Sequence, residues 1–157
     1  MRIAIVDDLA AERALLRARL ERQLQSRSVR AEICEYGSGE ALLAAQNEQR
    51  FAVTFLDIYM PGMSGMDTAR EIRRTDADCL LVFTTTSTDH ALEGFQVRAM
   101  HYLVKPFTEE EVGRLTDEIL ARIPRPDKYM ELKIDGSDIR LDYGAIVYAE
   151  QFAHMIH

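Results

Sequence analysis

The sequence has few cysteines and no long hydrophobic run. Its two cysteines, Cys34 and Cys79, lie in no spacing typical of a metal site or a redox pair. They fit free thiols in a reducing compartment, which predicts a cytoplasmic protein. No apolar run approaches the roughly 18 residues of a membrane-spanning helix, and the N-terminus turns acidic too early for a signal peptide. We therefore expect no membrane partner.

Positive charge is also scarce. The 157 residues include 19 Lys and Arg against 26 Asp and Glu, which gives a formal net charge of -7. Domains that bind nucleic acids usually carry a basic surface, and this composition does not provide one. With 47% hydrophobic and 29% charged residues, the chain is typical of an ordinary globular protein.

Short apolar runs alternate with helical patterns along the first 122 residues. The apolar runs predict strands at 2–6, 51–56 and 79–84, and shorter strand-like segments at 31–35 and 101–104 predict two more. The segments that follow them predict helices at about 9–27, 40–45, 64–74, 89–97 and 108–123. Ser64 is a candidate N-cap, and Thr108 with Glu111 forms a capping-box pattern. This alternation predicts a parallel α/β sheet covered on both faces.

The pattern changes after Ile123. Pro124 and Pro126 indicate a stiff linker, and residues 129–134 and 139–141 predict a hairpin turning at Asp135-Gly136. Further strand patterns lie at 145–149 and 152–156. A segment of this length falls below the ~40 residues usually needed for independent folding. We interpret residues 1–122 as one domain, 123–128 as a linker and 129–157 as the incomplete start of a β-rich domain, through which copies of the chain would pair or swap strands.

Chemically active side chains follow the predicted strands. Asp7 and Asp8 follow the first strand, Asp57 the third, Thr85 the fourth and Lys105 the fifth. The carboxyl ends of parallel strands meet at one edge of the sheet. Three carboxylates there repel one another unless a cation lies among them, and oxygen ligands suit Mg²⁺. The set predicts phosphoryl transfer with Asp57 as nucleophile, and with Lys105 and the Thr85 hydroxyl stabilising the phosphoryl oxygens.

These motifs resemble the receiver domain of two-component response regulators. The resemblance covers about residues 1–122 and is carried by Asp7-Asp8, Asp57-Ile-Tyr-Met-Pro-Gly, the threonine that ends the fourth strand, and Tyr102-Leu-Val-Lys105-Pro106-Phe107. It implies a flavodoxin-like, doubly wound, five-stranded parallel sheet of order 2-1-3-4-5. A receiver is a signalling switch and not an enzyme in the ordinary sense.

The resemblance also implies how the acidic residues act. Asp57 would accept a phosphoryl group from a sensor histidine kinase. Asp8, Asp57 and the backbone carbonyl of Tyr59 would bind Mg²⁺ directly, and Asp7 would contribute through water. The Lys105-Pro106 bond would be cis.

Two further residues would form the switch. Thr85 lies twenty residues before Lys105, where similar receivers place their switch hydroxyl, and Tyr102 would turn inward on phosphorylation. The alternatives are that the threonines at 84–86 serve only the strand and that Tyr102 is a half-buried edge residue with a hydrated hydroxyl.

The segment from Tyr129 to His157 resembles the opening strands of a LytTR DNA-binding domain. This implies a transcription regulator that acts as a homodimer on DNA through a complete output domain. The segment itself carries more acidic than basic side chains, so this fragment should not bind DNA.

Several other features have competing interpretations. The arginines of the first helix either face an acidic partner such as the kinase or form a solvated, ion-paired face, and we favour the second. The methionines near Asp57 form either a binding lip or ordinary packing. His154 and His157 are a weak metal candidate. The arginines of the first helix are Arg13, Arg17, Arg19 and Arg22, and the methionines near Asp57 are Met60, Met63 and Met66.

Three other functions compete with a phosphorylated switch. An aspartyl-phosphate phosphatase would need a second Asp two residues after Asp57, where Tyr59 stands. A nucleotide-binding module would need a glycine-rich turn where Asp7 and Asp8 stand. A receiver-like adaptor that is never phosphorylated remains as the third alternative.

Overall fold

The computed structural model describes residues 1–87, 89, 91–124, 129–134 and 137–142. The chain divides into two compact units, Met1–Arg122 and Ile123–His157. Among the described residues no helix is both long and apolar enough to cross a membrane.

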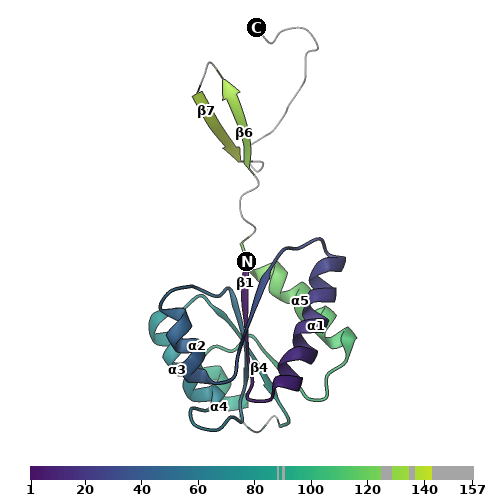
Figure 1. Cartoon of the computed structure of the whole chain (residues 1–157), viewed down its shortest axis with the longest axis vertical. Helices are drawn as coiled ribbons and strands as arrows, with labels where there is room; N and C mark the ends of the chain where they lie inside the picture. The colour runs from purple at the N-terminus through teal and green to yellow at the C-terminus, as the bar shows by residue number, and fades with distance from the viewer. Residues whose placement is uncertain (88, 90, 125–128, 135–136, 143–157) are drawn as a thin grey trace. The chain divides into compact units, whose positions relative to one another are not determined.

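The first unit is built on a five-stranded parallel sheet (Figure 1). Its strand order, β2-β1-β3-β4-β5, confirms the predicted flavodoxin-like topology. The predicted strand bounds are right to within one or two residues, because apolar runs mark buried segments but not the hydrogen bonds that end them. The strands are β1 (Arg2–Val6), β2 (Glu32–Tyr36), β3 (Val53–Asp57), β4 (Leu80–Thr85) and β5 (His101–Val104).

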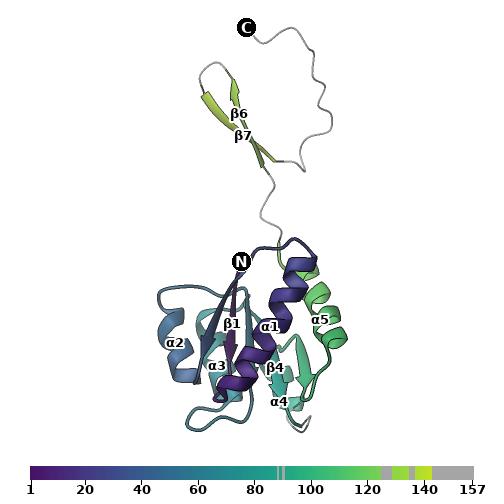
Figure 2. The same cartoon turned by 45° about the vertical axis from the view of Figure 1, so that its right-hand side comes forward.

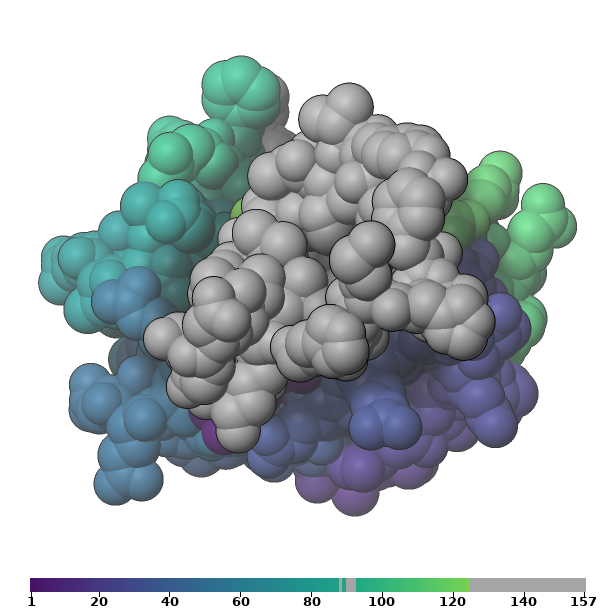
Figure 3. All heavy atoms as spheres, turned by 90° about the horizontal axis from the view of Figure 1, so that it is seen from above, coloured from purple at the N-terminus to yellow at the C-terminus, as the bar shows by residue number. Residues whose placement is uncertain are grey.

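Five helices cover the two faces of this sheet. They are α1 (Ala10–Ser26), α2 (Gly39–Gln46), α3 (Gly65–Thr75), α4 (Ala91–Gln96) and α5 (Glu109–Arg122). Helices α1 and α5 lie on one face, and α2, α3 and α4 lie on the other (Figures 1 and 2). Seen from above in space-filling form, the light-green atoms of α5 lie beside the purple-to-blue atoms of α1 (Figure 3).

Local capping explains where two of these helices begin. The Ser64 hydroxyl accepts a hydrogen bond from the Asp67 N–H at 3.1 Å, as the N-cap prediction requires. At α5, the Thr108 hydroxyl accepts from the Glu111 N–H at 3.2 Å, and the Glu111 carboxylate accepts from the Thr108 N–H at 2.6 Å. The predicted capping box is therefore present.

The core lies on both faces of the sheet, and its largest members, Phe55 and Phe83, are fully buried. Met60 and Met66 belong to the same buried cluster as Phe83, which supports the packing interpretation for these two methionines. Burial on both faces explains why the inner strands β1, β3 and β4 have largely apolar sequences rather than alternating ones, whereas the edge strand β2 carries two exposed glutamates.

The second unit contains an antiparallel hairpin. Strand β6 (Tyr129–Ile134) pairs with β7 (Ser137–Asp142), in agreement with the hairpin expected from the sequence. Most of the predicted linker, the Asp135-Gly136 turn, the strand patterns at 145–149 and 152–156, and His154 and His157 lie outside the described residues.

Candidate functional site

Three carboxylates meet at the carboxyl edge of the sheet. Asp57 is the last residue of β3, and Asp7 and Asp8 follow β1 directly. One oxygen from each of the three lies within 4.8 Å of the others. Asp7 and Asp57 are buried and Asp8 is exposed, so the cluster has an open side. These carboxylates meet because β1 and β3 are neighbours and run in parallel.

Lys105 brings a positive charge into this cluster from the end of β5. Its Nζ lies 2.7 Å from Asp7 Oδ2 and 3.5 Å from Asp57 Oδ1. Burial lowers the pKa of Lys105, but the hydrogen bond with Asp7 and the charges of Asp57 and Asp7 outweigh it, and the pKa is raised overall. The ammonium is therefore charged at neutral pH.

The environment of Asp57 disfavours its negative charge. Burial, followed by the charges of Asp7 and Asp8, raises the pKa of Asp57 to about 6, although Lys105 opposes this shift. One ammonium thus leaves three neighbouring carboxylates incompletely neutralised. Three hard oxygen donors with an open side suit Mg²⁺, which keeps several waters when protein ligands are few.

Hydrogen bonds between side chains and the backbone hold the segment between β1 and α1. The Leu9 N–H donates to Asp7 Oδ1 at 2.9 Å, which fixes the Asp7 carboxylate relative to the chain. Arg13 Nη1 donates to the backbone carbonyl of Asp7 at 2.5 Å. The sequence does not reveal this role for Arg13, since a position one turn into a helix is also typical of a solvated residue.

Gly65, at the start of α3, packs directly against the backbone of Asp57. A Cβ atom at this position would lie 2.0 Å from the Asp57 carbonyl oxygen, a distance that only glycine avoids. In the sequence, Gly65 stands out because the first helical position after the N-cap Ser64 ordinarily accepts larger residues. The reason for the glycine can be recognised only in the structure, where α3 approaches β3.

Thr85 ends β4, and Tyr102 lies on the neighbouring strand β5. Thr85 is fully buried, and its hydroxyl donates to the Ser87 carbonyl at 2.9 Å. The Tyr102 ring lies 5.4 Å from the Phe83 ring between centroids. Its hydroxyl lies against α4, where a Cβ on Gly94 would be 1.5 Å from it. Tyr102 is therefore half-buried, and its hydroxyl lies in a space that exists because residue 94 is glycine.

The structure also locates the remaining residues predicted for the site. The Lys105-Pro106 peptide bond is cis. Tyr59 lies two residues after Asp57, in the loop between β3 and α3, and its side chain is 49% exposed. The metal-binding role of its carbonyl stays a prediction.

The arginines of α1 have acidic partners within the chain. Arg17 lies 2.8 Å from Glu21, one turn along α1, and 3.0 Å from Glu35 on β2. Arg22 lies 2.7 Å from Glu109 in the first turn of α5. Arg13 and Arg19 lie farther from Glu35 and Glu109, at 3.8 Å each. These pairs support the interpretation of α1 as an ion-paired face.

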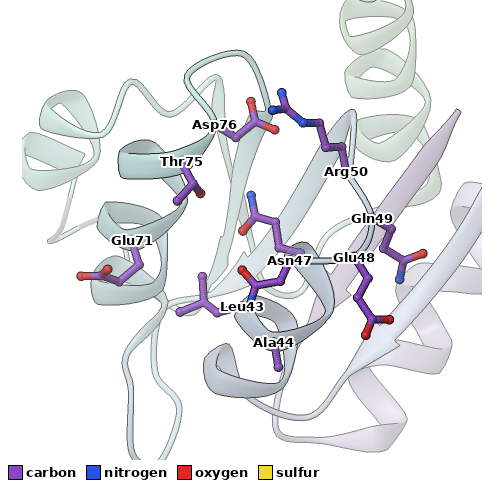
Figure 4. A pocket seen from close by; sticks show the side chains of 10 residues that line it. Leu43, Ala44, Asn47, Glu48, Gln49, Arg50, Glu71, Thr75 and Asp76 are labelled. Atoms are coloured by element: carbon purple, nitrogen blue, oxygen red, sulfur yellow. The ribbon is translucent and has the colours of Figure 1, made fainter.

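A separate hollow lies between α2 and α3 (Figure 4). It has a volume of ≈ 580 Å³ and is lined by side chains of both charge signs, including Arg50, Glu71 and Asp76. None of the residues predicted for phosphoryl transfer lines it. The acidic edge of the sheet therefore remains the candidate site.

Comparison with known families and proteins agrees with this geometry. The family model described as the response regulator receiver domain matches residues 3–116. The response regulator TrrA of Thermotoga maritima, solved in complex with Mg²⁺ and BeF, superposes with a TM-score of 0.64 at 29% identity. The match covers 75% of this chain and 97% of that one.

Two curated relatives are longer than this chain. The sensory transduction protein LytT of Oceanobacillus iheyensis is 34% identical over 107 residues, which is 67% of this chain and 43% of that protein. The positive alginate biosynthesis regulatory protein of Pseudomonas aeruginosa is 35% identical over 130 residues, 82% of this chain and 49% of that protein. The chain thus spans about half the length of these relatives. It belongs to the response regulator receiver family.

Proposed function

We propose that the chain is the phosphorylated switch of a two-component system, with Asp57 as the residue that accepts the phosphoryl group. The observation that carries this proposal is the convergence of Asp7, Asp8, Asp57 and Lys105 at one edge of the sheet. A purely structural ion-paired cluster has no need of three carboxylates around one ammonium.

The chemistry is a nucleophilic displacement at phosphorus. An Asp57 carboxylate oxygen forms a bond to phosphorus while the bond from phosphorus to the donor nitrogen of a kinase histidine breaks, and that nitrogen keeps the electron pair. With a pKa of about 6, Asp57 is mostly ionised at neutral pH and needs no general base. Lys105, 3.5 Å from Asp57, would stabilise the charge on the phosphoryl oxygens.

Asp8, Asp57 and the Tyr59 carbonyl would hold Mg²⁺ directly, with Asp7 acting through water. When bound, Mg²⁺ supplies positive charge against the phosphoryl oxygens and neutralises the repulsion between the carboxylates. The TrrA complex with Mg²⁺ and BeF supports this assignment by similarity.

The switch begins at Thr85. Its hydroxyl proton is committed to the Ser87 carbonyl, so donation to a phosphoryl oxygen on Asp57 requires that hydrogen bond to break. Breaking it would leave the turn after β4 with one of its two Thr85–Ser87 hydrogen bonds, the one that the Ser87 N–H donates to the Thr85 hydroxyl at 3.1 Å. Tyr102 packs against Gly94 of α4, so the two switch residues act on the same helix.

The output of this switch is a change in self-association. The face made by α4, β5 and α5 exposes Phe95, at 87%, and Val104, at 40%, both large apolar residues. We propose that this face forms a homodimer after phosphorylation and brings together two LytTR-type output domains on DNA. The similarity to LytT, a sensory transduction protein, and to the alginate biosynthesis regulatory protein supports a regulatory output.

Replacement of Phe95 by aspartate tests this output. Sedimentation of the wild-type chain should show more self-association when acetyl phosphate and Mg²⁺ are added than before, whatever pairing residues 129–157 already produce. Phe95→Asp should accept the phosphoryl group as before but show no such increase, since a charge buried in an interface costs several kcal/mol. A phosphorylated variant that dimerises like the wild type would rule out this face.

A further inference from the structure

The loop between β3 and α3 carries the Tyr59 carbonyl and is fixed at its base. The Gly65 N–H donates to the Ile58 carbonyl at 3.0 Å, and the Ile58 N–H donates to the Thr84 carbonyl at 3.2 Å. These bonds set where the loop begins and ends. Met60 is held by its burial in the core, so these contacts leave open what holds the outer part of the loop, from Pro61 to Met63.

A carboxylate from another element contacts this outer part. Glu40 Oε1 accepts a hydrogen bond from the Met63 N–H at 3.1 Å. The same oxygen lies 3.1 Å from where a Cβ on Gly62 would be, and Gly62 has a φ of +75°, a conformation that favours glycine. The Glu40 side chain therefore lies along the Gly62–Met63 turn.

Glu40 is well placed to hold the loop because α2 is itself held. The Ser38 hydroxyl caps α2 by accepting from the Ala41 N–H at 3.1 Å. Gly39 packs against α3 so closely that a Cβ there would lie 2.0 Å from the Thr68 hydroxyl oxygen. Glu40 follows directly in the first turn of α2, where the helix dipole favours a negative charge.

We propose that Glu40 is a positioning residue for Mg²⁺ binding. By accepting from Met63, it keeps the loop that carries the Tyr59 carbonyl ordered in one conformation before the metal binds. Without this contact, part of the binding free energy goes into ordering the loop. The inference rests on the proposed function, because it presupposes that Tyr59 is a ligand of Mg²⁺.

The test compares Glu40→Ala with Glu40→Gln in the full chain. The glutamine carbonyl can still accept from the Met63 N–H, whereas alanine cannot. We expect Glu40→Ala to raise the half-saturating Mg²⁺ concentration by roughly 3–10-fold, the effect of losing one hydrogen bond. Glu40→Gln should stay within about twofold of the wild type. Both thermal-shift titration and acetyl phosphate labelling report this concentration.

Labelling at saturating Mg²⁺ separates positioning from catalysis. Glu40→Ala should then reach the wild-type rate, because the reacting groups are intact. Glu48→Ala, which removes an exposed carboxylate beyond the end of α2, is the control for net charge and should match the wild type.

Two results would overturn the inference while leaving the proposed function intact. One is an unchanged half-saturating concentration in Glu40→Ala. The other is an equal loss in Glu40→Ala and Glu40→Gln, which would assign the effect to charge. If the wild-type chain itself shows no response to Mg²⁺, the proposed metal site fails, and the role of Glu40 fails with it.

Discussion

Asp8→Asn is expected to abolish the stabilisation that the protein gains from Mg²⁺. Asp8 is the exposed member of the acidic cluster, so its replacement removes a metal ligand without disturbing the core. In the wild-type chain, Mg²⁺ at ten times its dissociation constant should add about 1.4 kcal/mol to the free energy of unfolding. For a domain of this size, that raises the melting temperature by roughly 4–7 °C.

Differential scanning calorimetry with increasing Mg²⁺ measures this effect directly. Asp8→Asn should melt at the same temperature with and without the ion. Asp78→Asn is a matched control, because Asp78 is also exposed but lies at the opposite edge of the sheet, before β4. A normal Mg²⁺ response in Asp8→Asn would show that the ion binds elsewhere.

Asp57→Asn is expected to stabilise the metal-free protein at neutral pH. The folded chain raises the pKa of Asp57 from 3.8 to about 6, so the folded state holds the proton more tightly than the unfolded state does. The free energy of unfolding therefore falls as the pH rises from about 4 to about 6. Asparagine resembles the protonated acid, and the variant should be more stable at pH 7 by about 1–3 kcal/mol.

Urea unfolding in the presence of EDTA, at intervals between pH 4 and pH 7, tests this expectation. The wild-type chain should lose stability over this range relative to Asp57→Asn, and the two curves should converge near pH 4. Parallel curves would mean that Asp57 ionises normally in the folded state. Excess Mg²⁺ should reduce the difference, because the ion favours the ionised carboxylate.

The sequence is sufficient to predict the sheet because short, largely apolar segments alternate with helical patterns, although the edge strand β2 includes two glutamates. The helix bounds are less well predicted where no cap marks them. For α4, the pattern predicts residues 89–97, whereas the helix spans Ala91–Gln96. By contrast, Ser64 and Thr108 mark the starts of α3 and α5 correctly, since their hydroxyls satisfy backbone donors in the first turn.

The acidic site is predictable for a topological reason. Side chains that follow parallel strands come together at one edge, so the strand pattern alone is enough to place Asp7, Asp57 and Lys105 together. The closer approach of Lys105 to Asp7 than to Asp57 could not be predicted, since it depends on side-chain geometry.

The contacts that hold the loops and helices around the acidic site could not be predicted from the sequence. Glu40 and Met63 are joined by a hydrogen bond between residues 23 positions apart. Gly65 leaves room for α3 to approach the Asp57 carbonyl, and Gly94 leaves room for the Tyr102 hydroxyl. Each of these contacts depends on the angle and distance between packed elements, which local sequence patterns do not encode.

The central claim is that Asp57 becomes phosphorylated in a reaction that depends on Mg²⁺. The most direct measurement is the intact mass of the wild-type chain and of Asp57→Ala after incubation with acetyl phosphate, with Mg²⁺ or with EDTA. One acid-stable, base-labile phosphoryl group should appear on the wild-type chain with Mg²⁺ and on neither protein otherwise. A phosphoryl group on Asp57→Ala would place the acceptor elsewhere. No phosphoryl group on a wild-type chain that binds Mg²⁺ would contradict the account and favour an adaptor that keeps the receiver fold without its chemistry.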